Sequence, residues 1–320
     1  MKTRARWIMS LGFAHRAAAL FGALLVVACA VPDDEDVVWD SSGAGPVASA
    51  GAGGSGGGGG GGSAGGGSAG GGGDMIDADA NPKRYVYAAS DVFLFRMDVE
   101  TLGPGVVVEK VGEFKIDPDR MIDIAVTADE RIYGVTWSSG GSPSKLWGIN
   151  KDTAKATLIA EIPGGANVGL TFGADGTLLG ADKSGRTFRV DPATGEVTEI
   201  GVWGSGLGAS GDIVGTADGK LYGFADVGGS ASEAINSLVM IDPMTGAAEE
   251  VGLTGFDNLW GAGVWCGTFY AFRSDGDLLE IDVQTGKATM LASKIPGTQS
   301  GFSGAATPIF PAGTAGGICP

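Results

Sequence analysis

From Lys83 onward, short apolar runs alternate with turn residues. The runs are rich in Val, Ile, Leu, Tyr, Phe and Trp, and none extends into a sustained helical period. Short runs of β-branched and aromatic residues, bounded by Gly, Asp, Asn and Ser, are typical of β-strands. The pattern therefore predicts an all-β body over residues 83–310, followed by a short tail over 311–320.

One turn signature recurs five times, with spacings of 52, 41, 51 and 40 residues. It is a strand that ends in an Asx-turn, in which an Asp or Asn side chain accepts a hydrogen bond from the backbone two residues on. A Gly follows in most copies and suits the return strand. The copies begin at Asp98, Asn150, Asp191, Asp242 and Asp282.

A second signature, a tight turn between two apolar runs, precedes the first. It occurs at 128–134, 174–180 and 217–223, with an altered copy at 265–271. Asp-Gly between apolar runs favours a hairpin. Each repeat is therefore predicted to hold four antiparallel strands, a to d, with hairpin turns at a–b and c–d. Four strands per 40–50 residues is the unit of a β-propeller blade.

The two ends of the body complete this scheme. Residues 84–87 match a strand b that lacks its strand a, and residues 301–307 match a strand a with nothing after it. Placing the C-terminal strand in the first blade closes a five-bladed β-propeller and removes exposed sheet edges. Six blades are the alternative, and five copies of one turn argue against a two-sheet sandwich.

The Asp-Pro-x-Thr-Gly turns at Asp191 and Asp242 resemble those of a broad superfamily of bacterial β-propellers. That superfamily includes quinoprotein-like and TolB- or NHL-like repeats, and the resemblance covers residues 83–310. A pyrroloquinoline-quinone propeller would imply repeated docking tryptophans, which this sequence does not repeat. We therefore expect no cofactor.

Residues 1–28 predict a lipoprotein signal peptide. Four basic residues and no acidic one accompany an apolar run of 12 residues that ends at Ala28. A helix needs about 20 apolar residues to span a bilayer, so the run is too short for an anchor. The segment Val26-Val27-Ala28-Cys29 resembles the bacterial lipobox, which implies acylation of Cys29. An ordinary secretory signal with an incidental Cys29 is the alternative.

Residues 29–82 predict a disordered tether, because 19 of the 31 residues in 43–73 are Gly. The alternating acids at 77–81 lack the glycine and the closing glutamate of a calcium loop and are interpreted as linker. Ala30 is not the aspartate that retains enteric lipoproteins at the inner membrane. We therefore expect a lipid-anchored protein of the cell envelope, at the outer membrane or cell surface rather than the inner membrane.

Charge and composition narrow the chemistry. Loss of residues 1–28 leaves 17 basic against 37 acidic residues, a formal charge of −20. Such a chain repels phosphate backbones and anionic membrane lipids, so nucleic acid is not an expected partner. Contact with a membrane therefore needs the lipid anchor on Cys29. The only histidine, His15, lies in the signal. The mature chain therefore has no imidazole for catalysis or for a metal site, and no catalytic or metal-binding residue is predicted.

When the innermost strands are aligned on their turns, one level of the channel holds Asp123, Gly169, Asp212 and Trp260. Two amide side chains, Asn167 and Asn258, lie two residues earlier in their strands. The candidate ligand residues at this channel mouth are Asp123, Asn167, Asp212, Asn258 and Trp260. Carboxylates, amides and a tryptophan suit a sugar or a cation. The alternative is that the two carboxyls bond backbone amides of neighbouring blades, because buried polar groups need partners.

The two faces of such a ring differ. The a–b and c–d turns share one face, here called the turn face, and the longer connections, such as 136–145 and 225–236, share the other, the loop face. Binding residues favour long loops on a rigid scaffold. The tether enters on the turn face, so we expect the loop face to point away from the membrane. Trp137, Trp203 and Trp260 either line this face or fill the core.

Two cysteines remain after Cys29, an even count for an oxidising compartment. Cys266 lies in the a–b turn of the fifth blade, and Cys319 lies past the final strand in the adjacent first blade. A disulfide between them would staple the ring closure. Two unpaired thiols are the alternative, because spacing does not fix pairing.

Three functions fit these features. The favoured one is a membrane-anchored lipoprotein whose propeller is a non-catalytic binding or scaffold module for an envelope protein, a peptide or a glycan. The first alternative is a glycosidase that uses Asp123 and Asp212 as its central carboxylates. The second is a structural subunit of an envelope complex. Fold alone does not choose among them.

Overall fold

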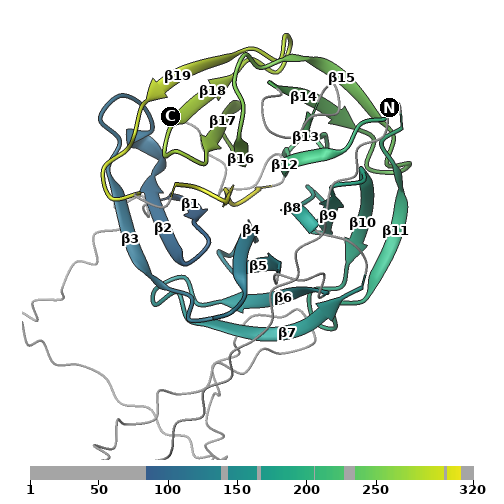
Figure 1. Ribbon diagram of the computed structural model, residues 1–320, viewed down its shortest axis with the longest axis horizontal. Coiled ribbons are helices and arrows are strands. Elements are labelled where there is room, and N and C mark those ends of the chain that lie inside the picture. The colour runs from purple at the N-terminus through teal and green to yellow at the C-terminus, as the bar shows by residue number, and fades with distance from the viewer. Residues whose placement is uncertain are drawn as a thin grey trace, which may run out of the picture. The chain divides into compact units, whose positions relative to one another are not determined.

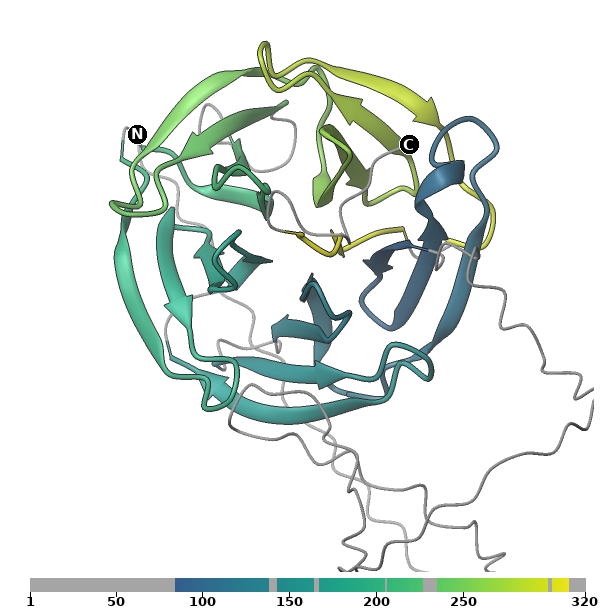
Figure 2. The ribbon, with the colours of Figure 1, turned by 180° about the vertical axis from the view of Figure 1, so that it is seen from behind.

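The computed structural model describes residues 84–137, 143–163, 167–204, 206–226, 235–298 and 301–310. In these ranges the chain forms twenty strands and one short 3-10 helix, η1 (Val99–Thr101). The strands make five four-stranded antiparallel sheets that radiate from a common centre (Figure 1). Figure 2 shows the same ring from the opposite face. The predicted five-bladed β-propeller is therefore confirmed. The predicted signal peptide, tether and C-terminal tail lie outside the described residues.

Each blade contributes its strand a to the centre and its strand d to the rim. Blade 1 contains β20 (Gly304–Ala306), β1 (Tyr85–Ala89), β2 (Phe93–Asp98) and β3 (Val108–Glu113). Blade 2 contains β4 (Arg120–Val126), β5 (Ile132–Trp137), β6 (Ser144–Ile149) and β7 (Ala156–Ile162). Blade 3 contains β8 (Asn167–Phe172), β9 (Leu178–Asp182), β10 (Arg186–Val190) and β11 (Val197–Val202). Blade 4 contains β12 (Ala209–Gly215), β13 (Leu221–Asp226), β14 (Asn236–Ile241) and β15 (Ala248–Leu253). Blade 5 contains β16 (Leu259–Trp265), β17 (Thr268–Arg273), β18 (Leu278–Ile281) and β19 (Ala288–Ala292).

The ring closes as predicted. The C-terminal strand β20 pairs antiparallel with β1, with Ala305 opposite Ala88 and Gly304 opposite Ala89. The last described strand of the chain is thus the inner strand of the blade that contains the first (Figure 1). This pairing gives blade 1 the same four strands as the other blades and covers the inner edge of β1.

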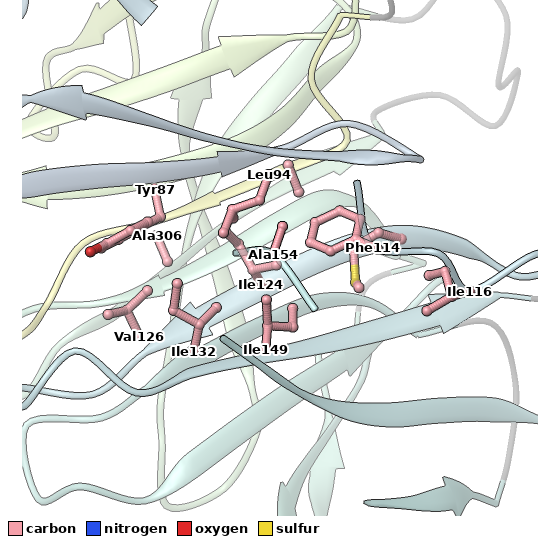
Figure 3. Packing of buried hydrophobic residues seen from close by; sticks show 12 residues of the cluster. Tyr87, Leu94, Phe114, Ile116, Ile124, Val126, Ile132, Ile149, Ala154 and Ala306 are labelled. Carbon is pink, nitrogen blue, oxygen red and sulfur yellow. The ribbon is translucent and has the colours of Figure 1, made fainter. Parts of the chain in front are cut away.

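The hydrophobic core is divided into five clusters, and each cluster lies between two neighbouring blades. The cluster between blades 1 and 2 packs Tyr87 and Leu94 against Ile124 and Ile149 (Figure 3). Burial of such side chains stabilises the fold by roughly 1.5–3 kcal/mol each. Adhesion between blades, rather than one central core, therefore holds the ring together.

Every outer strand carries a β-bulge near its end, where one extra residue turns into the core between blades. The bulged residues are Val111, Ile159, Ile200, Val251 and Leu291. A small residue follows each one: Gly112, Ala160, Gly201, Gly252 or Ala292. The recurring apolar-small pair in strand d is thus a structural signature of the repeat.

The small residue leaves room for the c–d turn of the next blade. A Cβ on Gly112 would lie 2.7 Å from the carbonyl oxygen of Thr153, and one on Gly201 would collide with that of Thr245. Gly252 meets Thr285 in the same way. The Thr of the Asx-turns in blades 2, 4 and 5 therefore interlocks with the outer strand of the preceding blade.

The Asx-turns form as predicted in all five blades. In each, the side-chain oxygen of the first residue accepts the backbone N–H two residues on, at 2.8–3.1 Å. Gly195, Gly246 and Gly286 follow with φ of +72°, +72° and +76°, a conformation that favours glycine. In blade 2, Ala154 takes the same place with φ of +61°.

We expect Gly201→Ala to lower the free energy of unfolding by about 1–3 kcal/mol, because the added Cβ meets the backbone of Thr245 and forces two blades apart. Urea unfolding followed by circular dichroism measures this change. Val202→Ala, at the next position and 57% exposed, is the control, with an effect within about 0.5 kcal/mol. Equal stability of the two variants would show that the interlock does not hold the blades.

Candidate functional site

The two central aspartates, Asp123 on β4 and Asp212 on β12, are fully buried and bonded to neighbouring blades. The N–H of Leu170 in blade 3 donates to Asp123 Oδ2 at 2.6 Å, and the N–H of Ala262 in blade 5 donates to Asp212 Oδ2 at 2.6 Å. The amide of Ala305 in blade 1 interacts with both carboxyls. The side chains therefore join the blades at the channel centre, which is the structural role that the sequence left open.

Glycines give these carboxyls their space. Strand pairing places Asp123, Gly169, Asp212, Gly261 and Gly304 at one level of the five inner strands. A Cβ on Gly304 would collide with Asp123 Oδ1, and one on Gly169 would lie 2.8 Å from a backbone nitrogen of β12. Two carboxyls thus fill the centre of a ring whose other three members have no side chain.

Burial raises the pKa of both central carboxyls well above the ordinary value. The charge of Asp123 raises the pKa of Asp212 further, whereas Asp212 and the surrounding backbone N–H groups oppose the rise for Asp123. Asp212 Oδ1 is buried and has no hydrogen-bond partner among the described residues. One carboxylic acid beside one carboxylate avoids two buried charges.

Neither central carboxyl presents a surface to a substrate, since each is 0% exposed. A glycosidase needs two carboxyl groups that both reach the scissile bond. Asp123 and Asp212 instead face backbone amides, so the described residues give the glycosidase alternative no support.

Trp260 does not share the level of the two carboxyls. Leu259 pairs with Arg273 and Gly261 pairs with Phe272, so Trp260 is the extra residue of a bulge in β16. The predicted alignment is therefore wrong by one residue in blade 5. Blades 2 and 3 have the same bulge, at Ile122 and Val168, so the shift arises in the a–b turn. Cys266 lies two residues past Val264, whereas Asp129 lies three residues past the equivalent Val126, so an alignment on the turns is displaced by one residue.

Trp260 instead belongs to a group of side chains at the loop-face end of the channel. Lys183 Nζ lies 5.3 Å from the ring centre of Trp137 and 5.8 Å from that of Trp260. Asp226 is nearby: burial raises its pKa, and the charge of Lys183 opposes the rise. We call Trp137, Lys183, Asp226 and Trp260 the mouth cluster. Its members come from blades 2, 3, 4 and 5 and lie at or next to the loop-face ends of β5, β9, β13 and β16.

The two predicted amides lie nearer the loop face than the carboxyls. Asn167 opens β8, and its buried side-chain nitrogen and oxygen have no hydrogen-bond partner within the described ranges. Asn258, just before β16, has a left-handed backbone with φ of +54°, and its carbonyl accepts the N–H of Ser274 at 3.1 Å. Asn258 stands three residues before Gly261, so it does not match Asn167, which stands two before Gly169.

Asn236 is the amide that organises this end of blade 4, and the sequence pattern did not single it out. Its Nδ2 donates to Asp226 Oδ1 and to Ser210 Oγ, both at 3.0 Å. Its Oδ1 accepts the N–H of Leu259 in blade 5 at 3.0 Å. An Asn at the start of a strand is common after a long connection, so its sequence position alone carried no signal.

The three tryptophans divide between core and surface. Trp203 is 2% exposed, and its Nε1 donates to Thr187 Oγ1 at 2.9 Å, so it belongs to the core. Trp137 is 37% exposed and Trp260 is half-buried. The core interpretation is therefore confirmed for Trp203 alone.

Cys266 is disulfide-bonded and is the only cysteine among the described residues. With Gly267 it forms the two-residue a–b turn of blade 5, with φ of +51° and +79°. Cys29 and Cys319 lie outside the described residues. Lipidation of Cys29 and pairing of Cys266 with Cys319 stay predictions.

In the described ranges, no three side chains of His, Cys, Asp or Glu gather as ligands for a metal ion. Nor does any helix there have the length and apolar character to cross a bilayer.

Residues 124–309 match the model of a family described as "Repeat of unknown function (DUF6923)". The match spans more than half of the chain, which therefore belongs to this family. No curated protein matches the chain.

Several solved structures share the fold. The chain is similar to a chain of a nidogen/laminin complex, with 13% identity, a TM-score of 0.47, and 71% of this chain and 99% of that one covered. It is also similar to TolB from Acinetobacter baumannii, with 16% identity and a TM-score of 0.43. That likeness covers 66% of this chain and 53% of TolB, so the chain spans about half of TolB. Regucalcin, a calcium-binding protein from Agrobacterium tumefaciens, is similar with 18% identity and a TM-score of 0.42, over 71% of this chain and 76% of that one. At these identities the likeness concerns the fold alone.

The central carboxyls predict a pH dependence of stability. In the folded chain the pKa of each carboxyl lies above the ordinary value of 3.8, so each binds its proton more tightly folded than unfolded. Their contribution to the free energy of unfolding is therefore complete below about pH 4 and is lost as the pH rises through the pKa values of the folded chain. Asp212→Asn removes one titrating group and keeps an acceptor for Ala262. We expect its unfolding free energy to fall less steeply above pH 4 than that of the parent, in urea titrations from pH 4 to 9.

Asp123→Ala is the matched comparison. It leaves the N–H of Leu170 buried without its acceptor, which costs about 1–3 kcal/mol. Identical pH profiles for Asp212→Asn and the parent would show that the pair does not share a proton.

Mass spectrometry of the alkylated, non-reduced mature protein should find no free thiol at Cys266 or Cys319, and a linked peptide should join the two. Closure of a loop of ~50 residues stabilises the chain by roughly 4 kcal/mol in the entropy model, so reduction should lower the midpoint of unfolding. Two alkylated thiols would contradict the pairing.

Proposed function

We propose that this chain is an exported lipoprotein, anchored in a membrane of the cell envelope through Cys29, whose propeller is a non-catalytic binding module for a protein, peptide or glycan. The observation that supports this proposal is the difference in partners between the central polar side chains and those of the mouth cluster. The central carboxyls are committed to backbone amides, whereas the mouth cluster keeps aromatic faces and an exposed ammonium group.

The position of the N-terminal strand supports an orientation for this module. Arg84 is the first described residue and stands at the turn-face end of β1, where its carbonyl accepts the N–H of Val99 at 3.1 Å. A tether that joins the body here attaches on the turn face. The mouth cluster lies on the opposite face and would point away from the membrane.

The proposal is tested on intact cells. Cys29→Ser should abolish incorporation of labelled palmitate and release the protein into the soluble fraction, while Cys266→Ser should keep the label. An epitope inserted at 138–142 should be bound by antibody at least several-fold better than one inserted into the 217–220 turn.

Both insertion variants must first show the parent's circular dichroism spectrum after purification. Palmitate on the Cys29→Ser variant would overturn the anchor, and better labelling of the 217–220 turn would overturn the orientation.

A further inference from the structure

The mouth cluster holds a lysine, Lys183, that lies near Asp226 but forms no ion pair within 4 Å with the part of the chain that the structure describes. Most arginines and lysines near the loop face are paired: Arg120 with Asp117, Lys145 with Asp119, Arg186 with Asp182 and Arg273 with Asp257, at 2.6–3.2 Å. Lys183 forms no ion pair with the described residues, and its ammonium is held by two indole rings instead.

Those two contacts leave the ammonium available to an anion. A cation–π contact at an exposed site contributes roughly 0.5–1 kcal/mol, which is weaker than a hydrogen-bonded ion pair in a partly desolvated site. Lys183 is exposed, and its nearest acidic neighbour in the cluster, Asp226, already accepts a hydrogen bond from Asn236. A carboxylate at this place can therefore pair with Lys183 without displacing a salt bridge. The net negative charge of the chain repels anions at long range, but salt screens that repulsion over about 10 Å, so the local ammonium group decides the pairing.

The tryptophans add a second requirement. Trp137 exposes 37% of its surface, and Trp260 is half-buried across the channel mouth from it. The face of an indole ring is electron-rich and attracts partners with a weakly positive surface. The C–H face of a pyranose ring is such a surface, and its hydroxyl groups donate to carboxylates such as Asp226.

A peptide is a poorer fit to this place. Peptides bind propeller-like sheets most simply by adding a strand to an open edge. The open edges here are the outer strands on the rim, away from the channel (Figure 2). Four of them carry glutamates that oppose edge pairing: β3, β7, β11 and β15.

Resting on the proposed binding function, we propose that the mouth cluster binds an acidic sugar, namely a uronic acid residue of an oligosaccharide. Its carboxylate pairs with Lys183, its ring stacks on Trp137 or Trp260, and a hydroxyl group donates to Asp226.

The test uses the full mature chain in detergent, with trigalacturonate as the probe and its methyl ester as the uncharged counterpart. Binding is followed by isothermal titration calorimetry and by tryptophan fluorescence. The parent should bind the acid at least tenfold more tightly than the ester. Added salt should weaken binding of the acid and leave binding of the ester unchanged.

Lys183→Gln removes the ammonium and should weaken binding of the acid at least tenfold, to the level of the ester. Trp137→Ala should weaken acid and ester alike. Lys155→Gln is the matched control, an exposed lysine in a c–d turn of the turn face, and should leave both affinities unchanged.

Three results would overturn the proposal: no saturable binding of trigalacturonate by the folded parent, equal affinity for acid and ester, or unchanged affinity in Lys183→Gln. None of these alters palmitate labelling or epitope exposure, so failure here is distinguishable from failure of the anchored binding module. Tenfold discrimination that is lost only in Lys183→Gln would establish the carboxylate site.

Discussion

Side chains that bond backbone amides across the junctions of the inner strands are the constraint on which this propeller depends. Asp123 joins blades 2 and 3, Thr171 joins 3 and 4, Asp212 joins 4 and 5, and Thr307 joins 5 and 1. Ala305 interacts with both carboxyls and so links blade 1 to blade 2 as well. In a ring of only five blades the inner strands are too close for more side chains, so these few groups satisfy the backbone at the centre.

The rim uses a different device for the same purpose. A bulge turns one apolar residue of each outer strand into the cluster between blades, and the small residue after it receives the next blade's Asx-turn. At the closure, the turn of blade 1 is longer, and Leu102 packs with Leu291 and Ala292 of blade 5 instead. The junction that joins the two ends of the chain therefore relies more on hydrophobic contact than on the repeated interlock.

This division of labour explains where binding chemistry remains. The polar side chains at the centre accept hydrogen bonds from the backbone of neighbouring blades, and those of the c–d turns accept hydrogen bonds within their own Asx-turns. The mouth cluster is different, because its members come from four blades, and Trp137, Lys183 and Trp260 form no side-chain hydrogen bond with the described residues. The ring of sheets below keeps the spacing of its indole rings and ammonium group fixed.

The sequence by itself determined the blade count, the ring closure and the Asx-turns, because each depends on local turn chemistry repeated along the chain: Asp191 and Asp242 bond their own turns wherever the blade lies. It also named Asp123 and Asp212 but left their role open between ligand and structure. Only the tertiary structure decided that role, since their partners Leu170 and Ala262 belong to other blades. It likewise placed Trp260 one residue away from the level of the carboxyls, because the a–b turn of blade 5 is shorter, and brought Lys183 to it from blade 3. Contacts across the ring depend on register and on space left by glycines, and neither is readable from one strand at a time.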